Sequence, residues 1–424
     1  MDASTIPVAE WSLSAQTELR FEVEDTDPVT LKLLDGTAEI FGTELPPSQQ
    51  FSFADGAKVA VFTWHGCRVQ LRGRPLHPYV STDTPMVAYL NAHAALEKMR
   101  ESVERARDLV GPRVVIVGSK DVGKTTLCRI LLGYATRWGR QPVYVDLDCG
   151  QNSISVPGCV AALPVDRPAD VEEGTFALRA PLVFHYGSAS PSENSDLYLA
   201  LISELARVVR RRFGTFAECR ASGCVVNTCG WIDGFGFKAI VHAVMEFDAN
   251  VVLVLDQERL FSQLKTSLGS SVQVVLLPKS GGVVSRSRSF RNDARMAAVR
   301  KYFYGTAKES LYPHSFNVGF DDVLVFKIGQ PRVPDSCLPL DAKKDDSATK
   351  VVSVALDMDL LHCVCGLSLA SGPSEDLART NVAGFVVVTD VSMEKRTLTL
   401  LSPAAHPLPR NCLLISDIRF VDMK

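Results

Sequence analysis

One eight-residue segment constrains this chain more than any other. The run Gly118-Ser-Lys-Asp-Val-Gly-Lys-Thr125 matches the phosphate-binding pattern G-x-x-x-x-G-K-[ST], and it stands between an apolar run, Arg113–Val117, and a helix-forming segment. Glycines let backbone N–H groups face an anion without obstruction by a Cβ, and the helix N-terminus adds partial positive charge. In this pattern Lys124 lies at the β- and γ-phosphates and the Thr125 hydroxyl binds Mg²⁺. The segment therefore predicts a nucleotide-binding protein.

The region around this motif has the pattern of an α/β domain. Apolar runs alternate with helical segments, and several of these runs are apolar throughout, which is typical of parallel strands buried on both faces. The expected strands are Val114–Val117, Val143–Leu147, Leu182–Tyr186, Cys224–Asn227, Val251–Leu255 and Val272–Leu277. The expected helices are residues 124–137, 194–213, 236–246 and 258–265. We therefore expect an α/β fold with a mostly parallel sheet.

Two carboxylates, Asp146 and Asp148, follow the second of these strands. A P-loop protein places a metal-linked or catalytic carboxylate at such a strand end. A carboxylate beside a bound phosphate can accept a proton from a substrate hydroxyl. The alternative is that either residue only caps the strand or forms a turn. The guanine signature Asn-Lys-x-Asp occurs nowhere, so a GTPase is the weaker interpretation.

The N-terminal region has a strand pattern of a different kind. In residues 12–75 apolar and polar residues alternate, as in residues 19–23, which predicts a small antiparallel β-domain. Asp35-Gly36 and Asp55-Gly56 are expected to form hairpin turns. Residues 86–108 have helical spacing and are expected to lead as a helix into the next domain.

Strand-like patterns return in residues 308–424. The expected strands there include Val351–Ala355, Phe385–Val388 and Leu398–Leu401. Residues 338–350 are polar and charged, and they are expected to form an exposed loop.

A basic segment lies at residues 285–301, where six residues are basic and one is acidic. Arg288, Arg291 and Arg295 fall on one helical face. In a P-loop kinase such a segment can be a lid that closes over the phosphates and brings arginines to the transferred group. A solvated helix or a passive RNA-binding face is equally compatible with the spacing.

Trp231 stands between glycines in the loop that follows the strand 224–227. That loop is expected at the ligand-facing edge of the sheet. The indole could stack on a base of the substrate. The alternative is that it packs against the sheet edge.

Composition limits the class of protein. Of the 424 residues, 46% are hydrophobic and 22% are charged, which excludes a mainly disordered chain. No apolar run approaches the length of a membrane span, and no signal peptide is evident, so no membrane partner is expected. The net charge is −3, so any nucleic-acid surface must be a local patch. The 11 cysteines are scattered without zinc-ligand spacing, and they are expected to be buried, reduced thiols.

The motifs belong to a larger set of sequence blocks. In the α/β region these blocks are Gly118–Arg129, Asp146–Gln151, Arg167–Gly174, Asn227–Trp231, Leu255–Leu260 and Pro278–Val284. In the N-terminal region they are Thr17–Glu22, Ala38–Leu45 and Gly56–Cys67. Together they resemble the polyribonucleotide 5′-hydroxyl kinase family, whose members act in tRNA splicing and in pre-mRNA cleavage and polyadenylation. The resemblance covers nearly the whole chain and is weaker after residue 310.

The resemblance implies three domains. Residues 1–98 would form an N-terminal β-sandwich that contributes to the adenine pocket. Residues 99–307 would form the central P-loop RNA kinase domain with its lid. Residues 308–424 would form a small C-terminal α+β or β domain.

The resemblance also implies an activity, the ATP- and Mg²⁺-dependent phosphorylation of the 5′-hydroxyl of RNA. Catalytic roles would fall to Lys124, Asp148, Arg286, Arg291 and Arg295. Nucleotide contacts would come from Glu18, Lys58, Gly118, Asp121, Val122, Gly123, Lys124, Thr125 and Thr126. RNA contacts would come from Gln151, Asn194 and Trp231, and Mg²⁺ would lie on Thr125 and Asp148. The strand pattern by itself predicts that Glu18 and Lys58 are solvated.

Two departures from the family pattern concern the grip on RNA. Asn152 follows Gln151 where the family often has Gly, and in the loop Ser190–Asn194 a Ser replaces the flexible Gly. Some family members bind ATP without phosphorylating RNA, so the alternative function is a catalytically silent ATP-binding scaffold. The partners implied are 5′-hydroxyl RNA and subunits of the tRNA-splicing endonuclease or the pre-mRNA cleavage factor, and the location implied is the nucleus.

Overall fold

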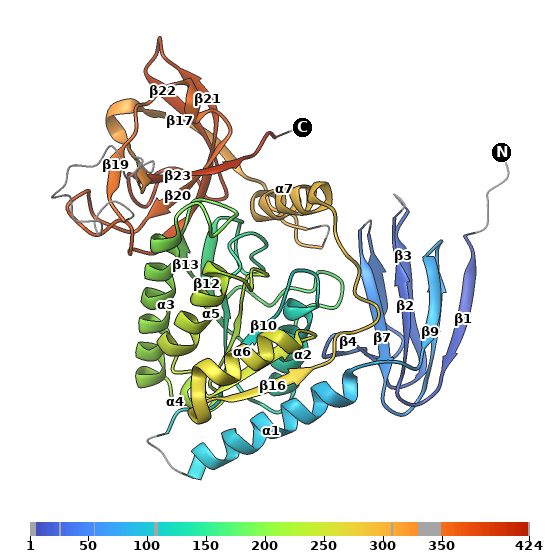
Figure 1. Ribbon diagram of the computed structural model, residues 1–424. Coiled ribbons are helices and arrows are strands. Elements are labelled where there is room, and N and C mark those ends of the chain that lie inside the picture. Colours follow the sequence, from blue (N-terminus) through green and yellow to red (C-terminus); the bar gives the residue numbers. More distant parts are fainter. Residues whose placement is uncertain are drawn as a thin grey trace, which may run out of the picture.

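The computed structural model describes residues 6–24, 27–54, 56–105, 109–306, 308–329 and 349–422. The chain forms an N-terminal β-sandwich, a central α/β domain and a C-terminal β domain (Figure 1). In Figure 1 the sandwich and the C-terminal domain lie on different sides of the central domain, and helix α7 (Arg288–Tyr304) lies between them. The expected fold class is confirmed.

The sandwich packs two antiparallel sheets face to face. The first sheet has the order β1-β8-β3-β6, formed by Val8–Leu13, Cys67–Arg72, Val29–Gly36 and Gln50–Phe53. The second has the order β5-β4-β7-β2-β9, formed by Thr43–Glu44, Glu39–Ile40, Lys58–Thr63, Thr17–Glu22 and Leu76–Ser81. Alternate residues of these strands, such as Leu19, Phe21, Leu31 and Val61, fill the core between the sheets.

The two expected hairpin turns of the sandwich are not hairpins. Asp35 and Gly36 continue β3 and pair with Arg68 and Cys67 of β8 after a bulge. The bulge absorbs the dipeptide into the strand because Gly36 takes a φ of +78°. Gly56 does lie in a turn, but that turn carries the chain from β6 in one sheet to β7 in the other. Asp55 lies outside the described residues.

Helix α1 (Met86–Arg105) joins the sandwich to the central domain. It runs through the boundary expected between residues 98 and 99 and packs against α2 (Lys124–Arg137). Its buried Arg100 donates to Glu97 and to the backbone oxygen of Ser222, at 3.1 Å in each case. The helix therefore fixes the position of the sandwich beside the P-loop helix.

The central sheet has seven strands in the order β13-β12-β11-β14-β10-β15-β16. Their bounds are Leu182–His185, Cys159–Pro164, Val143–Asp146, Cys224–Asn227, Arg113–Val117, Val251–Leu255 and Gln273–Leu277. The pairings among β11, β14, β10, β15 and β16 are parallel, whereas β12 pairs antiparallel with both of its neighbours. The mostly parallel sheet is confirmed, but β12 was not expected.

Helices cover both faces of this sheet. Val114 and Ile116 of β10 pack on the side of α1 and α2, while Val115 and Val117 pack on the opposite side. The opposite face is covered by α3, α5 and α6, which span Ser195–Thr215, Phe235–Glu246 and Glu258–Leu268. A short helix, α4 (Ala217–Ser222), was not expected.

The C-terminal domain is built on one mixed seven-stranded sheet in the order β17-β22-β21-β20-β23-β18-β19. Its strands span His314–Gly319, Thr397–Ser402, Val382–Ser392, Cys363–Ser368, Cys412–Arg419, Leu324–Ile328 and Val351–Ser353. Strand β21 contacts β13 of the central domain. Most of the loop expected at residues 338–350 lies outside the described residues.

Two expectations from composition can be compared with the described residues. The ten cysteines among them are free and buried, which confirms the prediction for those ten. Within the same residues, no helix has the length and apolar character needed to cross a membrane.

Candidate active site

A cavity of about 790 Å³ lies at the carboxyl edge of the central sheet, beneath the lid and beside the sandwich. The sandwich contributes Glu18, Arg20, Lys58 and Tyr79. The central domain contributes residues 120–126, Asp148, Gly150, Gln151, Gly174, Ser190, Ser192, Trp231, Arg286, Arg291 and Arg295. Most residues expected at the site, from segments far apart in the sequence, therefore line one cavity.

The P-loop connects β10 to α2. Gly118 has a φ of +154°, and a Cβ there would lie 3.0 Å from the backbone oxygen of Leu255. Gly123 takes the left-handed conformation at the N-cap of α2, where no side chain caps the helix and no acidic residue stands in the first turn. The N–H groups at this helix end are thus left for an anionic ligand.

Lys124 is 7% exposed, and its Nζ donates to the backbone oxygen of Ser119 at 2.8 Å. Burial lowers the pKa of Lys124, and the negative charge of Asp148 opposes that shift. The ammonium group is therefore held inside the loop that would surround the phosphates, next to the carboxylate expected to act on the hydroxyl.

The two carboxylates after β11 have different surroundings. Asp146 is fully buried and accepts hydrogen bonds from the Asp148 N–H (3.0 Å), the Ser153 N–H and hydroxyl (2.8 and 2.6 Å) and Asn227 Nδ2 (3.0 Å). Burial, and then the charge of Asp148, raise the pKa of Asp146 to about 6. Asp148 lines the cavity, and its Oδ1 accepts from the N–H groups of Gly150 (2.9 Å) and Gln151 (3.1 Å). Asp146 orders the strand end, and Asp148 faces the cavity.

The residues around Thr125 suit a hard cation such as Mg²⁺. Asn227 Nδ2 donates to Thr125 Oγ1 at 3.3 Å, while Asn227 Oδ1 is buried and has no hydrogen-bond partner among the described residues. Thr125, Asp148 and this unpaired oxygen are all oxygen donors, the type that Mg²⁺ prefers. The described residues contain no cluster of three His, Cys, Asp or Glu side chains around one point.

At the far end of the cavity Glu18 is buried, which contradicts the solvated position predicted by the strand pattern. Arg20 pairs with Glu18 at 2.5 Å, and the Thr84 hydroxyl donates to Glu18 at 3.0 Å. Lys58 is partly exposed and pairs with Glu22 at 2.7 Å. Both Glu18 and Lys58 line the cavity, in the place expected for the adenine. The strand pattern was misleading because Glu18 is enclosed by contacts from outside its own strand, such as the hydrogen bond from the Thr84 hydroxyl.

Two arginines of the cavity wall, Arg20 and Arg129, were not expected from the sequence. Arg20 lies against Tyr79, and a Cβ on Gly282 would lie 3.0 Å from its Cδ and Nε. Arg129 lies over the ring of Phe41 at 5.0 Å, and burial lowers its pKa to about 10. Both stand within sequence blocks already recognised, but strand or helix periodicity gives no sign that they face a ligand.

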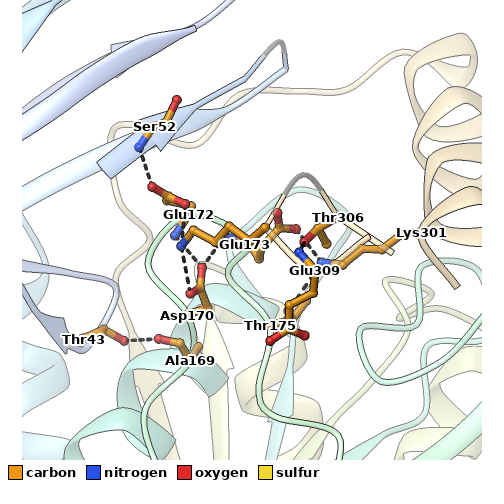
Figure 2. A network of polar contacts seen from close by, with 11 residues as sticks. Thr43, Ser52, Ala169, Asp170, Glu172, Glu173, Thr175, Lys301, Thr306 and Glu309 are labelled. Atoms are coloured by element: carbon orange, nitrogen blue, oxygen red, sulfur yellow. Dashed lines mark hydrogen bonds and ion pairs between the residues drawn. The ribbon is translucent and has the colours of Figure 1, made fainter. Parts of the chain in front are cut away.

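The loop that includes Gly174 was noted only as a sequence block, and it joins three parts of the molecule (Figure 2). Glu172 accepts from the backbone N–H of Ser52 in the sandwich, at 2.5 Å. Glu173 pairs with Lys301 of α7 at 2.6 Å. Asp170 accepts from the N–H groups of Glu172 and Glu173, at 2.9 and 2.8 Å, and so shapes the loop. The loop therefore connects the cavity wall to both the sandwich and the lid helix.

The lid reaches the P-loop through Asp121. The Oδ2 atom of Asp121 accepts from Arg291 at 2.5 Å and from the backbone N–H of Arg286 at 3.1 Å. Arg295 donates to the backbone oxygen of Gly150 at 3.0 Å. These contacts agree with the lid interpretation of the basic segment. Arg288, expected on the same helical face, is exposed and does not line the cavity.

Of the three residues expected to contact RNA, Trp231 and Gln151 line the cavity and Asn194 does not. Trp231 is half-buried, and its ring lies 5.4 Å from that of Phe235. The side chain of Asn194 instead caps α3, where it accepts from the Leu197 N–H at 3.1 Å. The N-cap role explains this residue locally, because Asn is a favoured cap.

Comparisons with known proteins identify relatives along the whole chain. A family model described as "mRNA cleavage and polyadenylation factor CLP1 P-loop" matches residues 118–305. Models described as "N-terminal beta-sandwich domain of polyadenylation factor" and "Pre-mRNA cleavage complex II protein Clp1" match residues 12–103 and 311–422. Polyribonucleotide 5′-hydroxyl-kinase Clp1 of Homo sapiens is 54% identical over 418 residues, which cover 99% of this chain and 98% of that protein. Protein CLP1 homolog of Anopheles gambiae is 50% identical over 422 residues, 99% of both chains.

Solved structures with the same fold include Clp1p in its complex with Pcf11p. Wild-type Clp1p in that complex has a TM-score of 0.85 at 24% identity and covers 98% of this chain and 99% of its own. A second structure, on the extended Pcf11p–Clp1p interface and on ATP loss in a point mutant, has a TM-score of 0.87 at 25% identity. It covers 98% of this chain and 100% of its own.

Proposed function

The chain belongs to the Clp1 family, and from that premise we propose that it is an ATP-dependent kinase that phosphorylates the 5′-hydroxyl of RNA. The observation that carries this proposal is the joint position of Lys124, Asp148, Trp231 and the lid arginines around one cavity. These are the parts that phosphoryl transfer needs: a phosphate cradle, a carboxylate for the hydroxyl, a platform for the substrate and cations for the transferred group.

In the proposed reaction Asp148 orients the RNA 5′-hydroxyl and accepts its proton as the oxygen attacks the γ-phosphorus of ATP. The two backbone N–H donors on Asp148 Oδ1 fix the carboxylate, which leaves its other oxygen for the hydroxyl. Lys124 and the lid arginines neutralise charge on the γ-phosphoryl group and on the departing ADP. Little covalent chemistry falls to the protein, so its contribution is positioning and electrostatics.

We propose Mg²⁺ as the cofactor, held by the Thr125 hydroxyl with Asp148 beside it. The ion would add Lewis-acid charge stabilisation at the phosphates. The support for this assignment is the oxygen-donor character of these residues and the position of Asn227, whose Nδ2 lies 3.3 Å from Thr125 Oγ1 and whose buried Oδ1 has no hydrogen-bond partner among the described residues.

The scaffold alternative, in which ATP is bound but not used, is less well supported. Lys124, Thr125, Asp148, Trp231 and the lid arginines are all present, and the 54%-identical human relative is named a kinase. An end-specific assay separates the two functions. A kinase adds one phosphate to a short 5′-hydroxyl RNA and none to the same RNA that already has a 5′-phosphate. A scaffold leaves both RNAs unchanged and returns its ATP intact.

We propose further that the protein works with subunits of the pre-mRNA cleavage factor, and with the tRNA-splicing endonuclease, in the nucleus. Support for a cleavage-factor partner comes from the solved relatives, which are complexes of Clp1p with Pcf11p. Support for the endonuclease and the nucleus is the family resemblance. Affinity purification of the tagged chain with mass spectrometry, and imaging of a fluorescent fusion, test these assignments. Absence of both sets of subunits, or exclusion from the nucleus, would contradict them.

A further inference from the structure

One acidic side chain of the P-loop has a role that phosphate binding does not explain. Asp121 lies in the middle of the loop and lines the cavity. A carboxylate there repels a triphosphate, because like charges a few ångström apart cost free energy even near a protein surface. A carboxylate in a phosphate cradle is better paired with a cation than with a phosphate, and the lid supplies such a cation.

The partner of Asp121 is Arg291. The guanidinium NH2 lies 2.5 Å from Asp121 Oδ2, and the two side chains are 24% and 15% exposed. The same oxygen accepts from the backbone N–H of Arg286. A single carboxylate oxygen therefore binds the lid by its main chain and by its arginine. Among the described residues, Asp121 is the one ion-pair partner of Arg291.

The backbone directs Asp121 toward the lid. Its φ is +56°, a left-handed conformation that Asp tolerates better than most residues. Nearby, a Cβ on Gly123 would lie 3.5 Å from a methyl carbon of Val283, so the segment before α7 passes directly over the P-loop. The lid is thus closed onto the loop through which nucleotide phosphates must be seated.

We propose that Asp121 is a latch for the lid, a positioning residue that holds Arg291 until the γ-phosphate of ATP replaces the carboxylate as its partner. A terminal phosphate has more negative charge and more acceptor oxygens than a carboxylate, so it takes over the arginine and places it on the group to be transferred. Asp121 is then a competitor of the nucleotide for Arg291, and not a nucleotide ligand. This inference rests on the proposed function in one respect, that Arg291 acts on the γ-phosphate.

If Asp121 holds the lid closed, it slows the association of ATP. Breaking it from either side, with Asp121→Asn or with Arg291→Ala, frees the lid and speeds ATP association. We expect an increase of about fivefold, since a partly exposed ion pair contributes up to about that factor to an equilibrium. Because both substitutions remove the same ion pair, the effect of Asp121→Asn is smaller when Arg291 is already Ala, and the part that remains is the direct repulsion between the carboxylate and the phosphates.

The test is stopped-flow association of a fluorescent N-methylanthraniloyl ATP with the full-length chain, in wild type, the two single variants and the double variant. Asp256→Asn is the matched control, because Asp256 pairs with Lys279 at 2.6 Å near the start of the lid and leaves Asp121 untouched. The expected result is faster association in both single variants, a smaller gain from Asp121→Asn when Arg291 is already Ala, and no change in the control. Melting temperatures of all variants identify any loss of folding, and Asp121→Glu, which retains the charge, is expected to restore slow association.

Two outcomes would overturn the latch. Unchanged or slower association in Asp121→Asn would show that the carboxylate does not hold the lid. An equal effect of Asp121→Asn with and without Arg291 would show that Asp121 acts on the nucleotide directly. The assay contains no RNA, so a protein that fails to phosphorylate RNA can still show the latch, and failure of the proposed function is distinguishable from failure of this inference.

Discussion

Asn227 connects the P-loop to the buried carboxylate beneath it: its Nδ2 lies 3.0 Å from Asp146 Oδ1 and 3.3 Å from Thr125 Oγ1. The connection links three neighbouring strands, because Asp146 ends β11, Asn227 ends β14 and Thr125 follows β10 through the loop. The position of the Thr125 hydroxyl, which we propose binds Mg²⁺, thus depends on a side chain that the sequence motif does not include.

Replacement of Asn227 by the similarly sized Leu removes this connection. The buried Asp146 then loses one donor, and leaving such a group underpaired costs about 1–3 kcal/mol. We expect that loss of unfolding free energy, together with a lower kcat because Thr125 is no longer held. Urea denaturation and steady-state kinetics measure the two effects. A variant with wild-type stability and kcat would show that the bridge is dispensable.

The substitutions Asp148→Asn and Asp146→Asn should affect different properties, catalysis in the first case and stability in the second. Asp148→Asn removes the proton acceptor, and we expect kcat to fall by about 10²–10⁴ while ATP affinity and stability change little. The carboxylate of Asp146 is fully buried and accepts five hydrogen bonds, so Asp146→Asn should mainly lower the unfolding free energy. Single-turnover transfer rates, ATP titration and urea melts of both variants separate the roles. Equal catalytic losses at unchanged stability would contradict this division.

Trp231 is expected to act on RNA and not on ATP. Base–aromatic stacking contributes about 1–3 kcal/mol per base, so Trp231→Ala should raise the KM for RNA by about 10-fold or more and leave the KM for ATP unchanged. Trp231→Phe retains a ring and should recover most of the affinity. If the Ala variant alters only thermal stability, the ring packs against the sheet edge and the stacking role is wrong.

The buried His93 is expected to make the unfolding free energy depend on pH. It is buried against Tyr134 and Trp138, neither ring nitrogen has a hydrogen-bond partner among the described residues, and burial lowers its pKa to about 4. The unfolded chain takes up a proton near pH 6.5 and the folded chain does not, so stability present above pH 6.5 is lost as the pH falls toward 4, by up to about 3 kcal/mol.

His93→Phe keeps the ring and removes this proton uptake. Urea denaturation is measured between about pH 4.5 and 7.5, a range around the pKa values of His93 in the folded and unfolded chain. Toward the acid end of this range, the unfolding free energy of the variant should fall less than that of wild type. Replacement of the exposed His65 by Gln is the matched control and should leave the slope unchanged. An equal loss of unfolding free energy at low pH in His93→Phe and in wild type would show that this histidine does not contribute to the loss.

The strands and helices of the central domain were predicted to within a few residues because they are long apolar or amphipathic runs buried on the sheet. Strand β14 and helix α2 have the expected bounds, Cys224–Asn227 and residues 124–137. Strand β12 was missed although it is almost wholly buried, since Cys159–Pro164 is a short apolar run with no flanking motif. The turn at Asp35-Gly36 was predicted wrongly because a bulge can absorb the same dipeptide.

The residues of the candidate site also differ in how well the sequence predicts them. A local motif gives the P-loop, because its chemistry needs residues at fixed spacing along the chain. Arg20 and Arg129 face the cavity only after the sandwich has docked beside α2, and no spacing in the sequence reports that docking. Asn194 is assigned to RNA by the family pattern, and the structure shows its side chain as the N-cap of α3, so its contact with RNA stays a prediction.

The central claim is that Lys124 and Asp148 transfer the γ-phosphate of ATP to the 5′-hydroxyl of RNA. The most direct measurement is transfer of label from γ-³²P-ATP to a short 5′-hydroxyl RNA by wild type, Lys124→Ala and Asp148→Asn, with ATP binding measured for each. We predict transfer by wild type and a loss of about 10²–10³ or more in Lys124→Ala, with a comparable loss in Asp148→Asn. Absence of transfer by wild-type protein that binds ATP, or full transfer by Lys124→Ala, would contradict the account.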